Sequence, residues 1–334
     1  SSRFGGSCLE PDPFPPGARP PPPGGGDPQG DWFLKILSLK LMTLYIVTFT
    51  SKTSYVRAVL CLNCLIYIKK MSQKPPPKQF VKTPVNGTRS VVLVSSAKGG
   101  VGKSTVAVNL AFALQNLGLK IGILDADVYG PSLPKLLNLN EKPKSEDGKA
   151  MIPLEKFNAQ CMSMGLLVDE QTPMIWRGPM VISALKTMTQ KVLWKDRDVI
   201  IVDMPPGTGD TQLTFAQEVK VDGAIIVSTP QDLALLDVKR GIQMFDKTGV
   251  KILGLIDNMS FFKGDDGKEY KIFGESGVEK TAKAFNKEFL GCLPIHQDLR
   301  RSADIGDPLT HSNPDHEISK IFKNIAEKIK QSFL

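Results

Sequence analysis

The sequence predicts an α/β fold in which a mainly parallel sheet is covered by helices on both faces. The first observation is that short runs rich in Val, Ile and Leu alternate with segments of helical periodicity across residues 90–334. The second is that these runs are apolar without alternation, as expected for strands buried on both faces of a sheet. Because a helical segment follows each strand, the crossover connections make neighbouring strands parallel.

The same patterns place each element along the chain. We expect strands at the runs dominated by β-branched and other apolar residues, in chain order 90–96, 120–124, 161–164, 199–203, 224–228, 251–257 and 289–294. We expect helices where apolar residues recur every three or four positions, at 103–117, 179–192, 211–217, 233–247, 275–286 and 316–333. Together these elements form one domain that spans residues 90–334.

The positive charge of the chain lies in front of this domain. The sequence has 42 basic and 34 acidic residues, a net charge of +8, and residues 1–90 contain 12 of the basic and four of the acidic ones. Residues 91–334 therefore carry 30 of each sign. A balanced domain argues against nonspecific nucleic-acid binding, which depends on many contacts between Lys or Arg and phosphate. We expect no nucleic-acid partner.

Composition divides the front of the chain into two parts. Residues 1–30 form a tail rich in Pro and Gly, which cannot bury enough apolar area to fold and is expected to be disordered. Residues 31–89 form a basic leader and linker without Asp or Glu from residue 32 onward, a composition typical of organelle transit peptides. The apolar stretch 41–49 is too short to span a bilayer. Met71 is an alternative start, which would leave a cytoplasmic protein.

The strongest motif lies where the first strand meets the first helix, in the segment AKGGVGKST at 97–105. A Gly-rich turn lets successive main-chain N–H groups converge on phosphate oxygens, and the helix N-terminus adds its dipole. This spacing predicts a three-layer P-loop NTPase that binds ATP and Mg²⁺, with Lys103 on the β- and γ-phosphates and Ser104 on the metal. The loop residues expected to surround the phosphates are Gly99, Gly100, Val101, Gly102 and Thr105.

Lys98 is a second lysine at the front of this loop. It resembles the signature of the deviant P-loop group that includes MinD, ParA, the nitrogenase iron protein and the Mrp ATPases. The resemblance implies that Lys98 reaches across a nucleotide-sandwich homodimer and contacts the phosphates of the partner. Lys98 and Lys103 are therefore both catalytic candidates, and an exposed surface lysine is the alternative for Lys98.

Carboxylates follow two of the predicted strands. Asp203 ends the strand 199–203, where P-loop NTPases place a carboxylate that contacts the ligands of Mg²⁺. The Gly-rich loop 204–209 that follows is suited to sense the γ-phosphate. Asp125 and Asp127 follow the second strand. The resemblance implies that Asp127 orients the attacking water and that Asp125 lies near the Mg²⁺ shell. Capping of the following turn is the alternative for both.

Several ordered motifs make the resemblance more specific. The chain resembles the Mrp family of ATPases over roughly 90–334, in the segments SSAKGGVGKST, ILDADVYGPSLPKLL, MSMGLLV, IWRGPM, VDMPPGTGDTQL, VSTPQDLALLD and GLIDNMSFF. The resemblance implies that Asn258 hydrogen-bonds the adenine, with a helix or turn cap as the alternative. It also implies an ATP-dependent carrier or scaffold that holds a [4Fe–4S] cluster and passes it to apoproteins, as the mitochondrial relatives do for respiratory complex I.

One part of the family pattern is missing. Most members have Cys-x-x-Cys shortly after the Asn-Met-Ser, whereas residues 261–270 of this chain read FFKGDDGKEY. We expect a polar hairpin turn there. Cys161 and Cys292 lie singly in apolar strands, where a free Cys acts as a small core residue. Cys61 and Cys64 have the spacing of a ligand pair but lie in the leader, which cleavage or a start at Met71 would remove. No iron–sulfur ligands are therefore identified.

A genuine leader would place the protein in the mitochondrial matrix.

Two alternatives to the carrier function stay open. A MinD- or ParA-like switch would bind a membrane or partner surface and carry no cluster, and a reductase similar to the nitrogenase iron protein would need cysteines at the dimer axis. The C-terminal helix 316–333 has one apolar face with lysines elsewhere. Such a helix binds membranes in MinD-type ATPases or packs on the sheet, and we favour packing and expect no membrane binding.

Overall fold

A computed structural model of the protein describes residues 82–146, 148, 150–167 and 178–333. The predicted tail 1–30, residues 31–81 of the predicted leader, and Cys61 and Cys64 lie outside the described residues. The helices and strands, in chain order, are β1 Thr88–Ser95, α3 Lys103–Asn116, β2 Ile121–Asp125, α4 Leu133–Leu136, β3 Ser145–Glu146, β4 Ala150–Met151, β5 Leu154–Lys156, β6 Ala159–Ser163, α5 Gly178–Gln190, β7 Arg197–Asp203, α6 Asp210–Glu218, β8 Gly223–Ser228, α7 Asp232–Thr248, β9 Ile252–Lys263, β10 Glu269–Tyr270, α8 Gly277–Ala284, β11 Phe289–Ile295, α9 Gln297–Ile305, α10 Leu309–Ser312 and α11 Glu317–Phe333.

The strands of the main sheet follow the order β10-β9-β8-β1-β7-β2-β6-β5, and β11 also pairs with β9. Each pairing among β6, β2, β7, β1, β8, β9 and β11 is parallel, whereas the short strands β5 and β10 pair antiparallel at the two ends. The prediction of a mainly parallel sheet is therefore confirmed. The register places Asp203 level with Val94 and Asp125, which brings the ends of β1, β2 and β7 to one edge.

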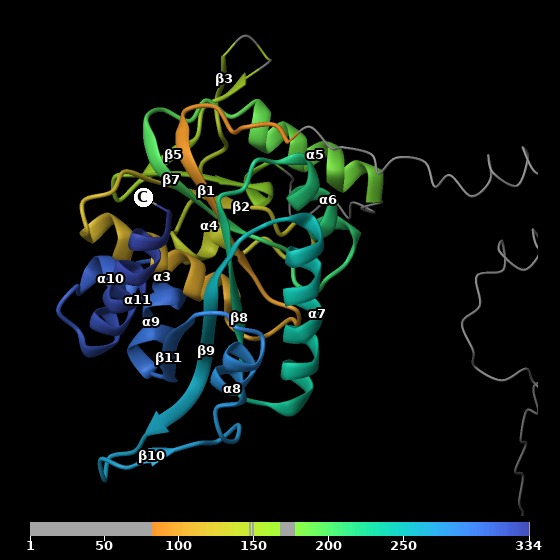
Figure 1. Ribbon diagram of the computed structural model, residues 1–334. Helices are drawn as coiled ribbons and strands as arrows, with labels where there is room; N and C mark the ends of the chain where they lie inside the picture. The colour runs from red at the N-terminus through yellow and green to blue at the C-terminus, as the bar shows by residue number, and fades with distance from the viewer. Residues whose placement is uncertain (1–81, 147, 149, 168–177, 334) are drawn as a thin grey trace, which may run out of the picture. The chain divides into compact units, whose positions relative to one another are not determined.

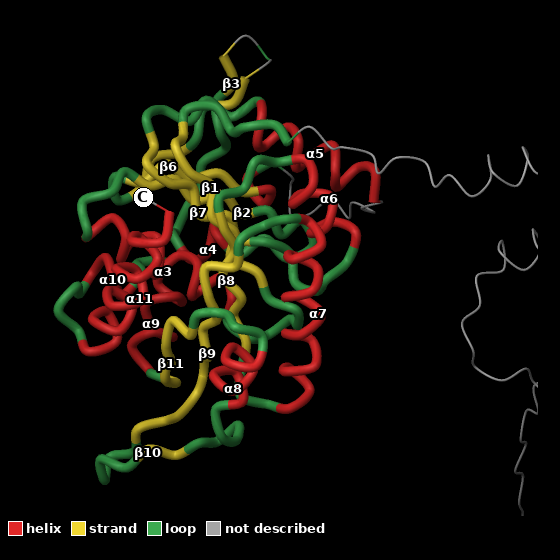
Figure 2. The backbone as a smooth tube through the Cα atoms, in the orientation of Figure 1, coloured by secondary structure: helices red, strands yellow, loops and turns green. Residues whose placement is uncertain are grey.

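Helices cover both faces of this sheet, as predicted (Figure 1). Along β1, Val92 and Val94 point into one apolar core and Val91 and Leu93 into the other, so the strand is buried on both sides. The first core also contains residues of α3, α9, α10 and α11, and the second contains residues of α5, α6, α7 and α8. Figure 2 shows the strands as one layer between these two groups of helices.

The C-terminal helix α11 packs on the domain through its apolar face. Ile318, Phe322, Ile325 and Ile329 are at most 2% exposed and belong to the core that α11 shares with α3 and β11. Burying a side chain of this size contributes roughly 1.5–3 kcal/mol to folding. The apolar face that a membrane would need is thus used inside the domain, and this agrees with the predicted packing. No helix among the described residues is long and apolar enough to cross a membrane.

The structure adds short elements that the sequence patterns did not predict. The helices α4 and α10 and the hairpin of β3 and β4 have too few residues to develop a periodic signal, and the residues of α9 are mostly polar. Helix α9 does carry local signals in the sequence, because His296 caps its N-terminus and Gly306 ends it with a φ of 75°. The strand predicted at 251–257 continues to Lys263, since its end forms a hairpin with β10 beyond the body of the sheet.

Candidate functional site

The Gly-rich loop connects β1 to α3 at the carboxyl edge of the sheet. Gly100 and Gly102 have φ values of 80° and 77°, a left-handed conformation that residues with a Cβ atom adopt at a cost. Gly102 is the N-cap of α3 and supplies no side-chain acceptor to the first turn of the helix. The main-chain N–H groups of that turn are therefore suited to an anion, as the predicted phosphate site requires.

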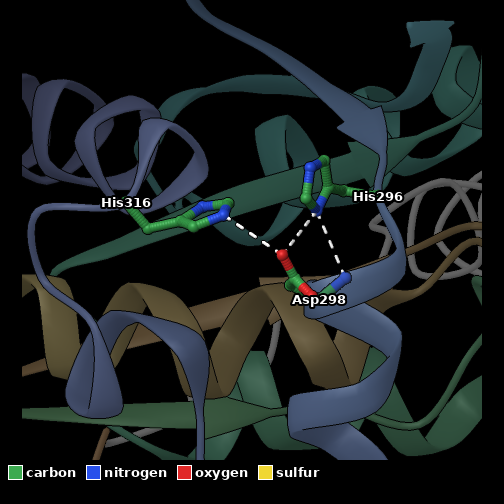
Figure 3. A group of neighbouring side chains, drawn as sticks. All are labelled: His296, Asp298 and His316. Carbon is green, nitrogen blue, oxygen red and sulfur yellow. Dashed lines mark hydrogen bonds and ion pairs between the residues drawn. The ribbon is translucent and has the colours of Figure 1, made fainter. Parts of the chain in front are cut away.

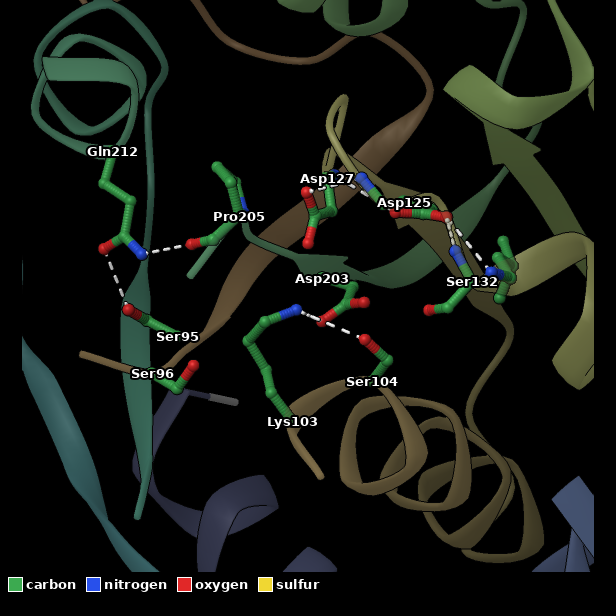
Figure 4. A network of polar contacts seen from close by, with 12 residues as sticks. Ser95, Ser96, Lys103, Ser104, Asp125, Asp127, Ser132, Asp203, Pro205 and Gln212 are labelled. Atoms are coloured by element: carbon green, nitrogen blue, oxygen red, sulfur yellow. Dashed lines mark hydrogen bonds and ion pairs between the residues drawn. The ribbon is translucent and has the colours of Figure 1, made fainter. Parts of the chain in front are cut away.

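Lys103 and Asp203 form a buried ion pair at the centre of the site (Figure 4). Lys103 is 6% exposed and its Nζ also lies 3.3 Å from the Oγ of Ser104, which follows it at the start of α3. Burial raises the pKa of Asp203, and the neighbouring Lys103 ammonium works against that rise. The structure thus brings together the side chains predicted to bind phosphate and Mg²⁺.

Asp125 lies at the end of β2 and is held by its own loop. Its Oδ2 accepts the N–H groups of Ser132 at 3.0 Å and Leu133 at 3.1 Å and the hydroxyl of Ser163 at 2.9 Å. Burial and the nearby Asp203 charge raise the pKa of Asp125 to about 7 in spite of these bonds. These contacts agree with the alternative in which Asp125 caps the following turn, and its place near the Mg²⁺ shell stays a prediction.

Asp127 begins the loop after β2 and is 8% exposed. Its Oδ1 accepts the main-chain N–H groups of Tyr129 at 3.2 Å and Gly130 at 3.3 Å, an Asx-type turn. The Asp127 charge adds to the rise in the pKa of Asp203, so the two carboxylates face each other across the site (Figure 4). Asp127 is therefore close to Asp203, and its role in orienting water stays a prediction.

Lys98 belongs to the loop, and Asn258 contacts the loop from β9. The Lys98 side chain is exposed at the front of the loop, and its contact with a partner subunit stays a prediction. Asn258, on β9, is 4% exposed, and its Nδ2 donates a hydrogen bond of 2.8 Å to the carbonyl oxygen of Val101. In this structure Asn258 therefore braces the P-loop, and the adenine contact stays a prediction.

The loop between β7 and α6 is tied to the P-loop strand. Met204 donates its N–H to the carbonyl of Val94 at 3.0 Å, and Gly207, with a φ of 98°, donates to the carbonyl of Ser96 at 2.9 Å. Gln212 in α6 adds a buried side-chain link from this loop to Ser95. No sequence pattern indicates this role of Gln212, because its partners Ser95 and Pro205 lie in other segments.

The hairpin of β9 and β10 occupies the place of the missing Cys-x-x-Cys. Lys263 pairs with Glu269 and Phe262 with Tyr270, and Gly264 donates its N–H to the carbonyl of Lys268 at 2.9 Å. This confirms the predicted hairpin turn, which projects from the body of the domain in Figure 1.

The cysteines of the described residues are far apart in the fold. Cys161 lies on β6 and Cys292 on β11, with β2, β7, β1, β8 and β9 between these strands in the sheet. Cys161 is fully buried, and burial raises the pKa of its thiol to about 12. Cys292 is half-buried, and burial raises its pKa as well. Both thiols thus behave as core groups, and they cannot share one cluster.

A second polar cluster, formed by His296, Asp298 and His316, lies where α9 and α11 begin (Figure 3). Each histidine Nδ1 accepts a main-chain N–H at 3.2 Å, from Asp298 and from Ile318. A neutral ring in this arrangement carries its proton on Nε2, so neither nitrogen is free to bind a metal, and the two helix N-termini disfavour a cation. We interpret this cluster as helix capping.

Comparisons with known proteins agree with this geometry. The family profile described as ParA, NUBPL iron-transfer P-loop NTPase, matches residues 87–330. The chain is 49% identical over 247 residues to an Arabidopsis thaliana protein named iron-sulfur protein required for NADH dehydrogenase, mitochondrial, covering 73% of this chain and 79% of that protein. It is 47% identical over 247 residues to the Escherichia coli iron-sulfur cluster carrier protein, covering 73% and 67%.

Solved structures show the same fold. A nucleotide-binding protein from Archaeoglobus fulgidus in complex with ADP superimposes with a TM-score of 0.59 at 34% identity, over 66% of this chain and 88% of that one. The cell division ATPase MinD from Pyrococcus furiosus superimposes with a TM-score of 0.54 at 22% identity, over 72% and 98%. The P-loop NTPase fold predicted from the sequence is therefore confirmed.

Proposed function

Because this chain belongs to the ParA family of NUBPL iron-transfer P-loop NTPases, we propose that it is an ATP-hydrolysing carrier that delivers iron–sulfur clusters to apoproteins. The ATPase activity rests on the loop at 97–105 and on the fold shared with ADP-binding relatives. The cargo rests on the names of the relatives, which are an iron-sulfur cluster carrier protein and a protein required for NADH dehydrogenase.

The observation that carries the ATPase assignment is the buried contact of Lys103 with Asp203 and Ser104 at the start of α3. With ATP bound, Lys103 would pair with the β- and γ-phosphates, and the oxygens of Ser104 and Asp203 would hold Mg²⁺. Oxygen ligands of this kind suit Mg²⁺, which supplies charge neutralisation at the phosphates when bound.

The remaining residues have supporting roles in this proposal. Asp127 orients the attacking water, and the loop residues Gly99 to Thr105 surround the phosphates. Lys98 contacts the phosphates of the partner in a homodimer, in keeping with its exposure at the front of the loop. Mass measurement in solution tests the dimer. We expect a dimer with a non-hydrolysable ATP analogue and Mg²⁺, and a protein that is monomeric both with and without the analogue would contradict it.

The cluster ligands are the demanding part of the carrier function. Iron–sulfur clusters are held by cysteine thiolates, and the described residues offer only Cys161 and Cys292, which lie on distant strands. The described residues therefore do not fit a cluster bound by a Cys-x-x-Cys pair of each subunit. We place the protein in the mitochondrial matrix on the strength of the basic leader and the mitochondrial Arabidopsis relative. A start at Met71 would leave it in the cytoplasm.

Anaerobic reconstitution tests the carrier function directly. The full chain is incubated with iron and sulfide, desalted, assayed for bound iron and sulfide, and then mixed with an apoprotein that is active only with a [4Fe–4S] cluster. We expect bound cluster and recovered activity of the apoprotein. ATP hydrolysis without bound iron and without recovery would contradict the carrier function.

The same result would favour a second function, a MinD- or ParA-like switch that binds a partner surface. The observation on its side is the hairpin of β9 and β10, which replaces the cluster loop of the family. The burial of the apolar face of α11 argues against a membrane as that surface. Sedimentation with anionic vesicles distinguishes the two surfaces: we expect no pelleting with ATP, and pelleting that requires ATP would contradict this expectation.

A further inference from the structure

Gln212 is a buried amide that no predicted role uses. It lies in the first turn of α6 and is 1% exposed. Its Oε1 accepts a hydrogen bond of 2.9 Å from the hydroxyl of Ser95, and its Nε2 donates to the carbonyl oxygen of Pro205 (Figure 4). Because a carbonyl oxygen only accepts, the contact with Pro205 sets the orientation of the amide. The Ser95 hydroxyl is then the donor of the other bond.

These contacts differ from those that a glutamine near the start of a helix usually makes. A Gln at the third helical position commonly reaches back to the main-chain N–H of the N-cap residue, here Gly209. The N-cap of α6 has no side-chain hydrogen bond, and Gln212 instead reaches sideways to two other segments. Its bonds therefore connect parts of the site and do not stabilise the helix end.

The two segments that Gln212 joins are the ones that hold the phosphate site. Ser95 is the last residue of β1, directly before the P-loop, and is 3% exposed. Pro205 lies two residues after Asp203, in the loop between β7 and α6. The loop is also held at Met204 and Gly207 by main-chain bonds to β1 and its extension. Gln212 holds the carbonyl between those two points and couples it to α6.

We propose that Gln212 is a positioning residue for ATP hydrolysis, which keeps the loop between β7 and α6 in register with the P-loop. It does not contact the nucleotide. It acts through its contacts with Pro205 and Ser95. These contacts keep Asp203 and the P-loop at a fixed spacing while ATP is hydrolysed. The proposal rests on the roles proposed above for Lys103 and Asp203.

The chemistry of the amide separates its two bonds. Gln212→Met keeps the length and volume of the side chain but loses both bonds. Gln212→Glu can still accept from Ser95 but places a carboxylate oxygen against the Pro205 carbonyl, so it replaces an attraction with a repulsion. Ser95→Ala removes one bond and leaves the other. We therefore expect Ser95→Ala to lower kcat least and the two Gln212 variants to lower it more.

A matched control exists elsewhere in the chain. Gln160 on β6 is also a buried glutamine, 4% exposed, whose Oε1 accepts the N–H of Lys195 at 2.9 Å. It pairs with Gly122 near the start of β2, at the opposite end of that strand from Asp125. Gln160→Met therefore removes a comparable buried hydrogen bond without touching the nucleotide site.

Steady-state ATP hydrolysis and ADP binding by the full chain test the proposal. We expect Gln212→Met to lower kcat by about tenfold to hundredfold, while KM for ATP and Kd for ADP stay within about twofold. Gln160→Met leaves kcat within about twofold after correction for folded protein. Because both bonds belong to one connection, adding Ser95→Ala to Gln212→Met lowers kcat no further.

Two results would overturn the inference. One is a kcat of Gln212→Met that equals that of Gln160→Met, and the other is a double variant whose losses multiply. If Gln212→Met fails to fold, Ser95→Ala decides the question by itself, since it leaves no charged or bulky group and should still lower kcat about threefold or more. Lys103→Ala is run beside these variants: unchanged turnover there would sink the proposed site, whereas a kcat loss there with none at Gln212 would sink only this inference.

Discussion

The P-loop offers a sharp test of the geometry, because two of its glycines share a backbone conformation and differ in their surroundings. Gly100 and Gly102 have φ values of 80° and 77°. A Cβ atom on Gly100 would meet nothing within 4 Å, whereas one on Gly102 would lie 2.4 Å from the Nδ2 of Asn258. Replacing each by Ala therefore separates the cost of the backbone conformation from the cost of the contact.

The size of the difference follows from the bond that the new methyl group displaces. A left-handed Ala costs about 1–2 kcal/mol at either position. At Gly102 the amide of Asn258 must also move, and since it is 4% exposed and bonded to the Val101 carbonyl at 2.8 Å, the move breaks a buried hydrogen bond. That loss adds about 1–3 kcal/mol. We therefore expect Gly102→Ala to be less stable than Gly100→Ala by about 1–3 kcal/mol.

Urea unfolding of the nucleotide-free protein measures this difference. Asn258→Ala in the Gly102→Ala background removes the displaced group, so the double variant should lose less than the sum of the two single variants. Equal stability of Gly100→Ala and Gly102→Ala, or fully additive losses in the double variant, would refute the contact between Asn258 and the P-loop.

Three further predictions concern Lys98, Cys161 and Asp257. Lys98→Ala should lower ATP turnover together with the ATP-dependent dimer, and turnover that falls without loss of the dimer in mass measurements would contradict its reach to the partner. Cys161 should stay unmodified by a thiol reagent in the native protein, because it is fully buried and its pKa is raised to about 12, and peptide mass mapping after native and denatured labelling checks this. Burial raises the pKa of Asp257 from its usual 3.8 to about 6, so the folded state binds its proton more tightly than the unfolded state does. The stability from this proton is present below about pH 4 and is lost as the pH rises to about 6, by up to about 3 kcal/mol, and Asp257→Asn should remove that part of the slope in urea titrations at several pH values.

At the carboxyl edge of the sheet, local structure follows from the sequence, whereas side-chain contacts between segments do not. The spacing of AKGGVGKST predicts the strand, the loop and α3, because the conformation of a Gly-rich turn before a helix depends on residues that are adjacent in the chain. The same holds for the apolar strands, whose residues are buried on both sides as their composition indicates. Helix α9 was missed because its residues are mostly polar, so no apolar periodicity marks it.

The side-chain partners across the site could not be predicted from the sequence in this way. The family resemblance implied a role near the nucleotide for Asn258 and Asp125, but it did not show that Asn258 bonds to the Val101 carbonyl or that Asp125 is held by Ser132 and Ser163. Gln212 had no predicted role at all. Each of these bonds depends on the register of strands and on the path of loops between them, which no single segment encodes.

The sequence by itself determined the fold class, the position of the P-loop and the missing Cys-x-x-Cys of this chain. These features depend on residue type at short spacing, where sterics and hydrogen bonding act within one turn or strand. Only the tertiary structure decided which buried groups meet: Lys103 with Asp203, Asn258 with Val101 and Gln212 with Ser95. The physical reason is that a buried polar group must find a partner, and the packing of segments 100 to 157 residues apart selects which partner that is.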